Sequence, residues 1–375
     1  MPQTPPAAMT MKILNAHIAK NLLFNTAMAL AILTFVMLSG QFFRAFDLVS
    51  RGVSPAILGQ FLFYLIPNML RFTLPLAMLV ATVLVFSRMS ADNEIVAMKA
   101  VGISLFQIIA PALLLSFLLC GLCLWLSLSV APHFRYQADQ LRWSAAANSP
   151  LAMLEPGAFT EIFPNCLMRV GQQNQGELHD IHIIMLDDSG QQVQDITARQ
   201  GCVDINEDER VVELTLQRAT VTDMSIDGTQ DPSALRHLNA ESIRIPFDYG
   251  AAQDQKKLTR KLKYLDLKML FARISLDSER GQDVTEHLVE LHSRLSMSIA
   301  PFSFLLIGLP FGIRSRRSEL SVGILLCVLL ALGFYAFLLC GDALKDQPRF
   351  HPTLIIWLPN FLYQAAGIAA FRIMR

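Results

Sequence analysis

Apolar residues along this chain gather into six long runs, three before and three after a long polar region. An α-helix needs about 20 mostly apolar residues to cross a hydrocarbon core of about 30 Å, because lipid cannot satisfy exposed backbone groups. Each run meets that length, so the pattern predicts six membrane-spanning helices. The predicted spans cover residues 18–43, 57–86, 105–130, 295–313, 322–340 and 354–371.

The polar region between the third and fourth runs shows a period of two instead. Val212, Leu214 and Leu216 alternate with polar residues, which is typical of a strand with one buried face. We therefore expect a sandwich or jelly-roll-like β domain. Beyond it, leucines recur every three or four positions up to residue 294, so the chain is expected to return to the membrane as helix. The other predicted strands are 166–170, 181–186, 193–198, 201–205, 219–224 and 242–247.

These elements predict the fold class: an α-helical polytopic membrane protein with six transmembrane helices, three plus three, and an inserted β-jelly-roll-like domain outside the membrane. The first run lacks a convincing small-residue cleavage site, so it is expected to remain as a membrane anchor. The expected division is 1–11 as a disordered N-terminus, 12–131 as spans one to three with a short helix at 90–103, 132–257 as the β domain, 258–294 as a helical connector and 295–375 as spans four to six.

Basic residues near the span ends predict the orientation of the chain. The groups that fall on one side are Lys12 with Lys20, Arg88 with Lys99, Arg314 with Arg316 and Arg317, and Arg372 with Arg375. Because cytoplasmic loops carry an excess of Lys and Arg, both termini are expected in the cytoplasm and the β domain outside. The bias is incomplete, since the opposite side carries Arg44, Arg51, Lys345 and Arg349.

Composition agrees with a membrane protein. Hydrophobic residues make up 53% of the chain and charged residues 17%, which is too apolar for an ordinary soluble domain. The formal net charge is zero, so nothing points to a nucleic-acid partner. Four of the six cysteines lie in apolar runs and are expected to pack there. Cys166 and Cys202 lie in the β region, where a disulfide could join them, but separate thiols are the leading expectation.

The segment 90–103, between the second and third runs, has the pattern of a short amphipathic helix. Asp92 and Glu94 fall in its first turn, where the helix dipole favours anions, and Gly102 can end it in a left-handed cap. The alternative is a solvated connector, and periodicity alone does not choose between the two. The apolar positions about three apart, which could face a partner groove, are Ile95, Met98 and Val101.

The same segment carries a resemblance to a known family. From Glu94 to Gly102 the sequence reads Glu, Ile, Val, Ala, Met, Lys, Ala, Val, Gly. It resembles the coupling helix that joins the second and third spans in the LptF/LptG permease family. The resemblance covers essentially everything after Met11, although the β domain matches only in pattern. Further matches, in order along the chain, are Gln41 to Arg44, Pro67, Leu74 to Leu76 and Leu309 to Gly312.

The resemblance implies a bacterial inner-membrane permease that extracts lipopolysaccharide and pairs with a paralogous or identical permease above a dimer of a separate cytoplasmic ATPase, LptB. The β domain would pass lipid to LptC-like and LptA-like proteins of a periplasmic bridge. The chain has no GxxxxGKS or GxxxxGKT phosphate loop, so we expect no enzymatic activity and no cofactor, with energy supplied by the ATPase. The expected ATPase-coupling residues are Asp92, Glu94, Ile95, Met98 and Gly102, with Glu94 docking on the ATPase.

Three arginines are candidate substrate ligands. Arg44 matches a usually basic family position that is attributed to lipid phosphates, a task that suits a bidentate, permanently charged guanidinium. Arg51 is a weaker candidate. Arg71 lies well inside the second span, where a charge costs of order 2.5 to 3.5 kcal/mol or more and needs a partner or a wet cavity. The family tends to be uncharged there, so its expected cavity-lining role is not carried over from the family. The alternatives are snorkelling to headgroups for Arg44 and a structural pairing for Arg71.

Two other functions stay open at this point. A lipoprotein-releasing or MacB-like permease also combines a few spans with an external domain, but usually places it after the first span, whereas here it follows the third. A non-transporting scaffold that binds partners through its β domain would not need an ATPase-docking helix. No catalytic triad, nucleophile elbow or metal-ligand spacing supports an enzyme or a metal site.

Overall fold

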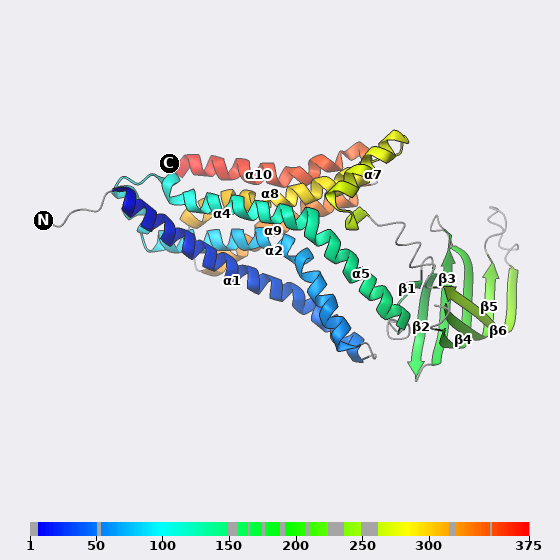
Figure 1. The fold of residues 1–375 in the computed structure, drawn as a ribbon. Helices are drawn as coiled ribbons and strands as arrows, with labels where there is room; N and C mark the ends of the chain where they lie inside the picture. Colours follow the sequence, from blue (N-terminus) through cyan, green and yellow to red (C-terminus); the bar gives the residue numbers. More distant parts are fainter. Residues whose placement is uncertain are drawn as a thin grey trace. The chain divides into compact units, whose positions relative to one another are not determined.

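The computed structural model describes residues 7–50, 54–148, 157–163, 166–174, 177–187, 192–206, 211–223, 236–248, 262–314, 320–345 and 347–374. The chain divides into two compact units. The helical unit comprises Met1–Gln41, Phe63–Tyr136 and Lys261–Arg375, and the unit that holds the sheet comprises Phe42–Leu62 and Gln137–Arg260. Figure 1 follows the helices and strands along the chain.

The helices before the sheet are α1 (Ala7–Ser50), α2 (Pro55–Ala91), α3 (Glu94–Ala100), α4 (Leu105–Trp125), the π-helix η1 (Leu126–Val130) and α5 (Ala131–Asn148). After it come the 3-10 helix η4 (Leu262–Tyr264), α7 (Leu267–Glu279), α8 (Thr285–Arg314), α9 (Leu320–Ala343), the 3-10 helix η5 (Pro348–Phe350) and α10 (Pro352–Met374). The stretches long and apolar enough to cross a membrane are Ile13–Phe43, Pro55–Ala91, Leu105–Leu141, Thr285–Arg314, Gly323–Ala343 and Pro348–Ile373. The six predicted spans are therefore confirmed, whereas α1 begins within the stretch expected to be disordered.

Helices α2 and α8 approach closely because α8 carries two glycines four residues apart. A Cβ added at Gly308 would lie 3.2 Å from Leu79, and one added at Gly312 would lie 3.0 Å from Phe86, both on α2. Small residues at this spacing let helix backbones pack tightly in a membrane. At the end of the same contact, Ser90 Oγ donates to the Ile313 carbonyl at 2.6 Å, so the two helix ends are fixed together.

Helices α8 and α10 are joined by a buried polar network. Asn360 Nδ2 donates to Ser296 Oγ at 2.7 Å, while Ser303 Oγ donates to Asn360 Oδ1 at 2.6 Å. Gln364 Nε2 extends the network to Ser303 Oγ at 3.0 Å. Ser296, Ser303 and Asn360 are at most 1% exposed, so the contact between these two spans is polar at its centre.

A π-helical turn separates α4 from α5 (Figure 1). Pro132, the second residue of α5, has no N–H to donate, and its ring would clash with the Leu128 carbonyl four residues earlier in a regular helix. The wider turn, in which the Ala131 N–H donates to the Leu126 carbonyl, relieves that clash. Proline therefore explains the π turn, and the helix continues beyond it.

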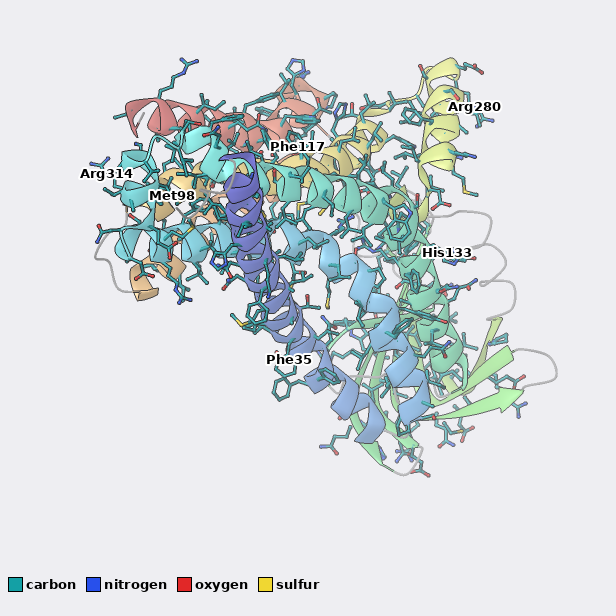
Figure 2. The ribbon with its side chains drawn as sticks, turned by 60° about the vertical axis from the view of Figure 1, so that its left-hand side comes forward. Phe35, Met98, Phe117, His133, Arg280 and Arg314 are labelled. Carbon is teal, nitrogen blue, oxygen red and sulfur yellow. The ribbon has the colours of Figure 1, made fainter. Side chains whose placement is uncertain are left out.

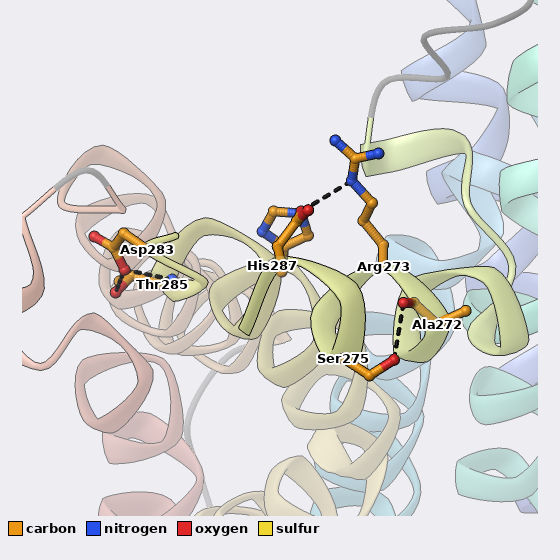
Figure 3. Close-up of polar contacts among 7 residues, drawn as sticks. Ala272, Arg273, Ser275, Asp283, Thr285 and His287 are labelled. Atoms are coloured by element: carbon orange, nitrogen blue, oxygen red, sulfur yellow. Dashed lines mark hydrogen bonds and ion pairs between the residues drawn. The ribbon is translucent and has the colours of Figure 1, made fainter. Parts of the chain in front are cut away.

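Helix α7 packs against the start of α8 through both apolar and charged contacts. Leu270 of α7 and Leu291 of α8 share one apolar cluster. Closer to the connecting turn, the buried Asp277 carboxylate accepts from Arg273 Nε at 2.9 Å and lies 3.2 Å from His287 Nε2. Figure 3 shows Arg273 and His287 at this place. At that turn, the Thr285 backbone N–H and hydroxyl donate to Asp283 Oδ1, and these hydrogen bonds lower the pKa of Asp283 (Figure 3).

The sheet is an antiparallel meander in which each described strand pairs with its neighbours in sequence. The predicted β domain is confirmed, and the order of these described strands is that of a meander, without the crossover connections of a jelly roll. One face buries an apolar cluster that includes Ile183, Ile196, Leu214 and Leu216. The strands are β1 (Thr160–Phe163), β2 (Cys166–Asn174), β3 (Glu177–Leu186), β4 (Gln192–Asn206), β5 (Val211–Asp223) and β6 (Arg236–Asp248).

A crease crosses the sheet at one level, through Asp180, Arg199, Arg218 and Glu241, where the paired register is interrupted. Asp180 and Arg218 have φ of 52° and 53°, so the backbone turns left-handed there. Across the crease the buried positions jump by three residues instead of two. The jumps run from Leu178 to Ile181, from Ala198 to Gly201 and from Leu216 to Ala219.

No disulfide joins the two cysteines of the sheet. Cys166 is buried on β2 and Cys202 is exposed on β4, with β3 between them. The leading expectation of separate thiols therefore holds for this pair.

Candidate functional site

Helix α3 lies against the helical unit through its apolar side. Ile95 is 4% exposed and belongs to the large apolar cluster that includes Phe86 and Ile108, and Met98 packs against the same cluster. Figure 2 places Met98 and Arg314, the last residue of α8, at the same end of this unit. Ile95 and Met98 therefore pack α3 against the helical unit, whereas Val101, the third residue expected to face a partner groove, is 82% exposed.

Both ends of α3 are fixed by their local sequence. Asn93, just before the helix, has a left-handed φ of 56°. At the other end Gly102 has φ of 90°, as the predicted cap requires. The Gly102 N–H donates to the Lys99 carbonyl at 3.0 Å and the Ile103 N–H to the Met98 carbonyl at 3.0 Å, which together form a Schellman motif. Ser104 then caps α4 with Gln107, so the turn leaves little freedom to the short helix.

The outward side of α3 carries Glu94 and Lys99 together with small and apolar residues. Glu94 is exposed, Val96 is 45% exposed and Val101 is 82% exposed. Asp92 lies 3.8 Å from Arg88 in a pair whose side chains are 56% and 86% exposed, so this pair contributes little to stability. Of the expected coupling residues, Asp92, Glu94 and Gly102 are thus exposed, whereas Ile95 and Met98 support the helix from inside.

A second site surrounds Arg71 on α2. Its guanidinium lies over the Phe72 ring at 4.5 Å, while its Nε atom is buried without a hydrogen-bond partner among the described residues. Of the charged groups that act on Arg71, Glu290 attracts it, and Arg135 and Arg294 repel it. Glu290 already accepts a hydrogen bond from Arg294 Nε at 2.8 Å. The site therefore carries an excess of positive charge.

The level of this site along the helices follows from the helix contacts. Arg71 on α2 and Arg294 on α8 each lie 19 residues before the bonded pair Ser90 and Ile313. At 1.5 Å per residue, both arginines lie about 28 Å from that end. Arg71 and Arg294 therefore lie at one level of the helical unit, far from the end that carries α3.

Arg294 fixes the segment through which the chain returns from the sheet. It is 2% exposed, and it donates to the Leu265 carbonyl at 2.7 Å and to the Leu262 carbonyl at 3.3 Å. Glu290 and these two carbonyls therefore accept hydrogen bonds from the buried guanidinium of Arg294. Sequence reasoning missed Glu290 and Arg294, whose only signal is their spacing of four residues on a predicted helix.

Two of the predicted substrate ligands cannot be placed. Arg44 belongs to α1, but its side chain lies outside the described residues, as does Arg51. Of the three predicted arginines, only Arg71 has a described environment. No cluster of three or more His, Cys, Asp or Glu side chains suited to a metal ion occurs within the described part of the chain.

Six spans in two groups of three, an inserted antiparallel sheet and an exposed helix between spans two and three define a multi-pass membrane permease. The chain belongs to the lipopolysaccharide export system permease LptF/LptG family, whose profile it matches over residues 16–373. No curated protein sequence matches it. As a member of this family, the protein is a permease subunit of the inner-membrane lipopolysaccharide export transporter, which also contains an ATPase and a partner permease, and it is not itself an enzyme.

Proposed function

We propose that this permease is driven by ATP through α3, on which a separate LptB-like ATPase dimer docks from the cytoplasm. The observation that carries the proposal is the division of α3 into two sides. Ile95 anchors it in the apolar cluster of the helical unit, while Glu94 stands exposed beside Val96 and Val101. A helix held in this way can pass a displacement of the partner to the spans behind it.

The contacts behind α3 support such a transfer. Ser90, four residues before Glu94, donates to the Ile313 carbonyl and so links the end of α2 to the end of α8. The Schellman motif at Gly102 and the capping box at Ser104 tie the other end to α4. Movement of α3 would therefore reach three spans at once. In this proposal both termini and α3 are cytoplasmic, and the sheet is periplasmic.

We further propose that the sheet hands lipopolysaccharide to LptC-like and LptA-like bridge proteins. Strand β6 is at the edge of the meander and has a neighbour on one side only among the described strands. Its Pro246, which lacks an N–H, is typical of an edge strand. An edge of this length offers backbone groups to a strand from another protein.

Within the membrane, Arg44 and Arg51 are proposed to bind phosphates of the lipid, as the family resemblance implies. The partner permease, paralogous or identical, would complete the cavity. Lipid would enter laterally, and its extraction would be conformational, with no covalent step in this chain.

The coupling proposal is tested by reversing the exposed charge on α3. Glu94→Arg should abolish co-purification of the ATPase and lipopolysaccharide release, since the side chain is exposed and the fold does not depend on it. Glu279→Arg, an exposed charge reversal at the end of α7, is the matched control and should retain both. If Glu94→Arg binds the ATPase as well as the control does, or if labelling from outside the cell reaches position 94, the docking assignment is wrong.

A further inference from the structure

Three buried polar atoms of the helical unit, all far from the end that carries α3, lack a hydrogen-bond partner among the described residues. They are Asn68 Oδ1, Arg71 Nε and Ser127 Oγ. A buried polar group left unpaired costs about 1–3 kcal/mol, so such groups in native proteins are normally satisfied by water or a ligand. Three of them in one region therefore indicate a site that is completed by something bound.

The contacts between α2 and α5 bring these atoms to one level. The rings of Tyr64 and Phe134 lie 5.8 Å apart, which fixes the two helices side by side. Arg71 is seven residues after Tyr64, and Ser127 is seven residues before Phe134. The two helices run in opposite directions, so Arg71 and Ser127 both lie about 10 Å deeper than the ring contact. Asn68 is three residues from Arg71 and shares its helix face.

Charge selects the kind of ligand. Arg71 is repelled by Arg135 and Arg294, and its one attracting partner, Glu290, is already bonded to Arg294. The surplus positive charge at a low-dielectric boundary requires an anion. In the proposed orientation, with Ser90 at the cytoplasmic boundary, a level about 28 Å away is that of lipid headgroups on the outer side.

We propose that Arg71, with Asn68 and Ser127, binds a phosphorylated sugar of the transported lipopolysaccharide. Arg71 Nε donates to the phosphate, as guanidinium groups do in a bidentate manner. Asn68 Oδ1 accepts from a neighbouring sugar hydroxyl or acyl amide, and Ser127 Oγ completes the site from the π turn. The rings of Phe63, Tyr64 and Phe134 form its outer rim. The proposal rests on the proposed transport of lipopolysaccharide.

The test uses the complete transporter, with its ATPase and partner permease, in nanodiscs of uncharged phosphatidylcholine. Bound lipopolysaccharide per complex is measured by native mass spectrometry for wild type, Arg71→Gln, Arg71→Lys and Ser127→Ala. Loss of a charge-assisted hydrogen bond should lower the affinity of Arg71→Gln about tenfold. Arg71→Lys, which keeps the charge but loses the guanidinium fork, should fall between wild type and Arg71→Gln. Ser127→Ala, which keeps the charge and the packing, should lose less than Arg71→Gln. The matched control, Arg372→Gln at an exposed position of α10, should bind as wild type does.

Dephosphorylated lipopolysaccharide separates the phosphate contact from general packing. With this lipid, the amount bound by the wild-type complex should fall to the amount bound by Arg71→Gln, so that the two complexes no longer differ in binding. Equal binding of normal lipopolysaccharide by wild type and Arg71→Gln, or an unchanged difference with the dephosphorylated lipid, would overturn the proposal. Displacement by added phosphatidylglycerol would also overturn it, by assigning the site to bilayer lipid. A wild-type complex that binds no lipopolysaccharide at all would instead refute the proposed function.

Discussion

Replacement of Gly367 by alanine tests a close contact between the backbones of α8 and α10. On α8, Pro310 cannot donate to the Leu306 carbonyl, which is left without its helical partner. Gly367 of α10 fills the space beside that carbonyl. A Cβ at this position would lie 2.5 Å from the Leu306 carbonyl carbon and still nearer to its oxygen, whereas ordinary contacts begin at 3.4 Å. Backbone cannot turn away as a side chain can, so α10 has to move by about 1 Å.

The cost of that movement follows from the polar network beside it. Gln364 Nε2 donates to Ser303 Oγ at 3.0 Å, one turn from Gly367. A shift of about 1 Å lengthens this bond beyond hydrogen-bonding range, which costs about 0.6 kcal/mol for a contact inside a membrane. Overpacking itself costs about 1–3 kcal/mol. Gly367→Ala should therefore lower the free energy of unfolding by about 1.5–3.5 kcal/mol.

The assay is unfolding of the purified protein by titration with sodium dodecyl sulfate in mild detergent. Gly121→Ala on α4 is the control, because a Cβ there meets nothing within 4 Å and should change stability little or raise it slightly. The reasoning is refuted if Gly367→Ala unfolds at the same detergent fraction as Gly121→Ala.

Two further substitutions probe the α7–α8 contact and α3. Asp277→Ala removes the buried carboxylate shared by Arg273 and His287 and should weaken the α7–α8 contact by about 1–3 kcal/mol, seen as faster tryptic cleavage at Arg280 than in Ser275→Ala. Cleavage no faster than in that control would count against the contact. Gly102→Ala places a Cβ at φ 90° and should cost about 1 kcal/mol, loosening α3 and reducing ATPase co-purification relative to Gly121→Ala. Unchanged co-purification would show that the cap does not matter for docking.

The sequence predicted the spans and the short helix between spans two and three because each has a strong local signal. The bounds of the strands were harder to predict, because the crease interrupts the alternation of buried and exposed residues. Buried and exposed positions alternate on each side of Arg199 and of Arg218, but across these two residues the next buried position comes after three residues instead of two. Residues 193–198 and 201–205 were therefore predicted as two strands, although they form the single strand β4, and β5 was divided in the same way.

The environment of α3 and of Arg71 could not be predicted for a different reason. In a soluble protein an apolar stripe marks the buried side of a helix, but lipid also accepts apolar residues, so periodicity loses its meaning near a membrane. In the spans, large apolar residues are exposed and polar residues are buried. Leu329 and Leu332 of α9 are 58% and 61% exposed, whereas Ser303 and Asn360 are buried at the α8–α10 contact.

Small and polar residues, rather than large apolar ones, therefore mark the inside of this helical unit. Gly308, Gly312 and Gly367 mark close backbone contacts, and Ser296 and Asn360 mark the hydrogen-bonded one. The same rule places three further polar residues inside the helical unit: Asn68, Arg71 and Ser127. Each of them has one buried polar atom that lacks a hydrogen-bond partner among the described residues. The polar residues at the α8–α10 contact are satisfied and hold the helices together, whereas those around Arg71 are the ones proposed to bind substrate. The two kinds of position look alike in sequence, and the contacts around each decide between them.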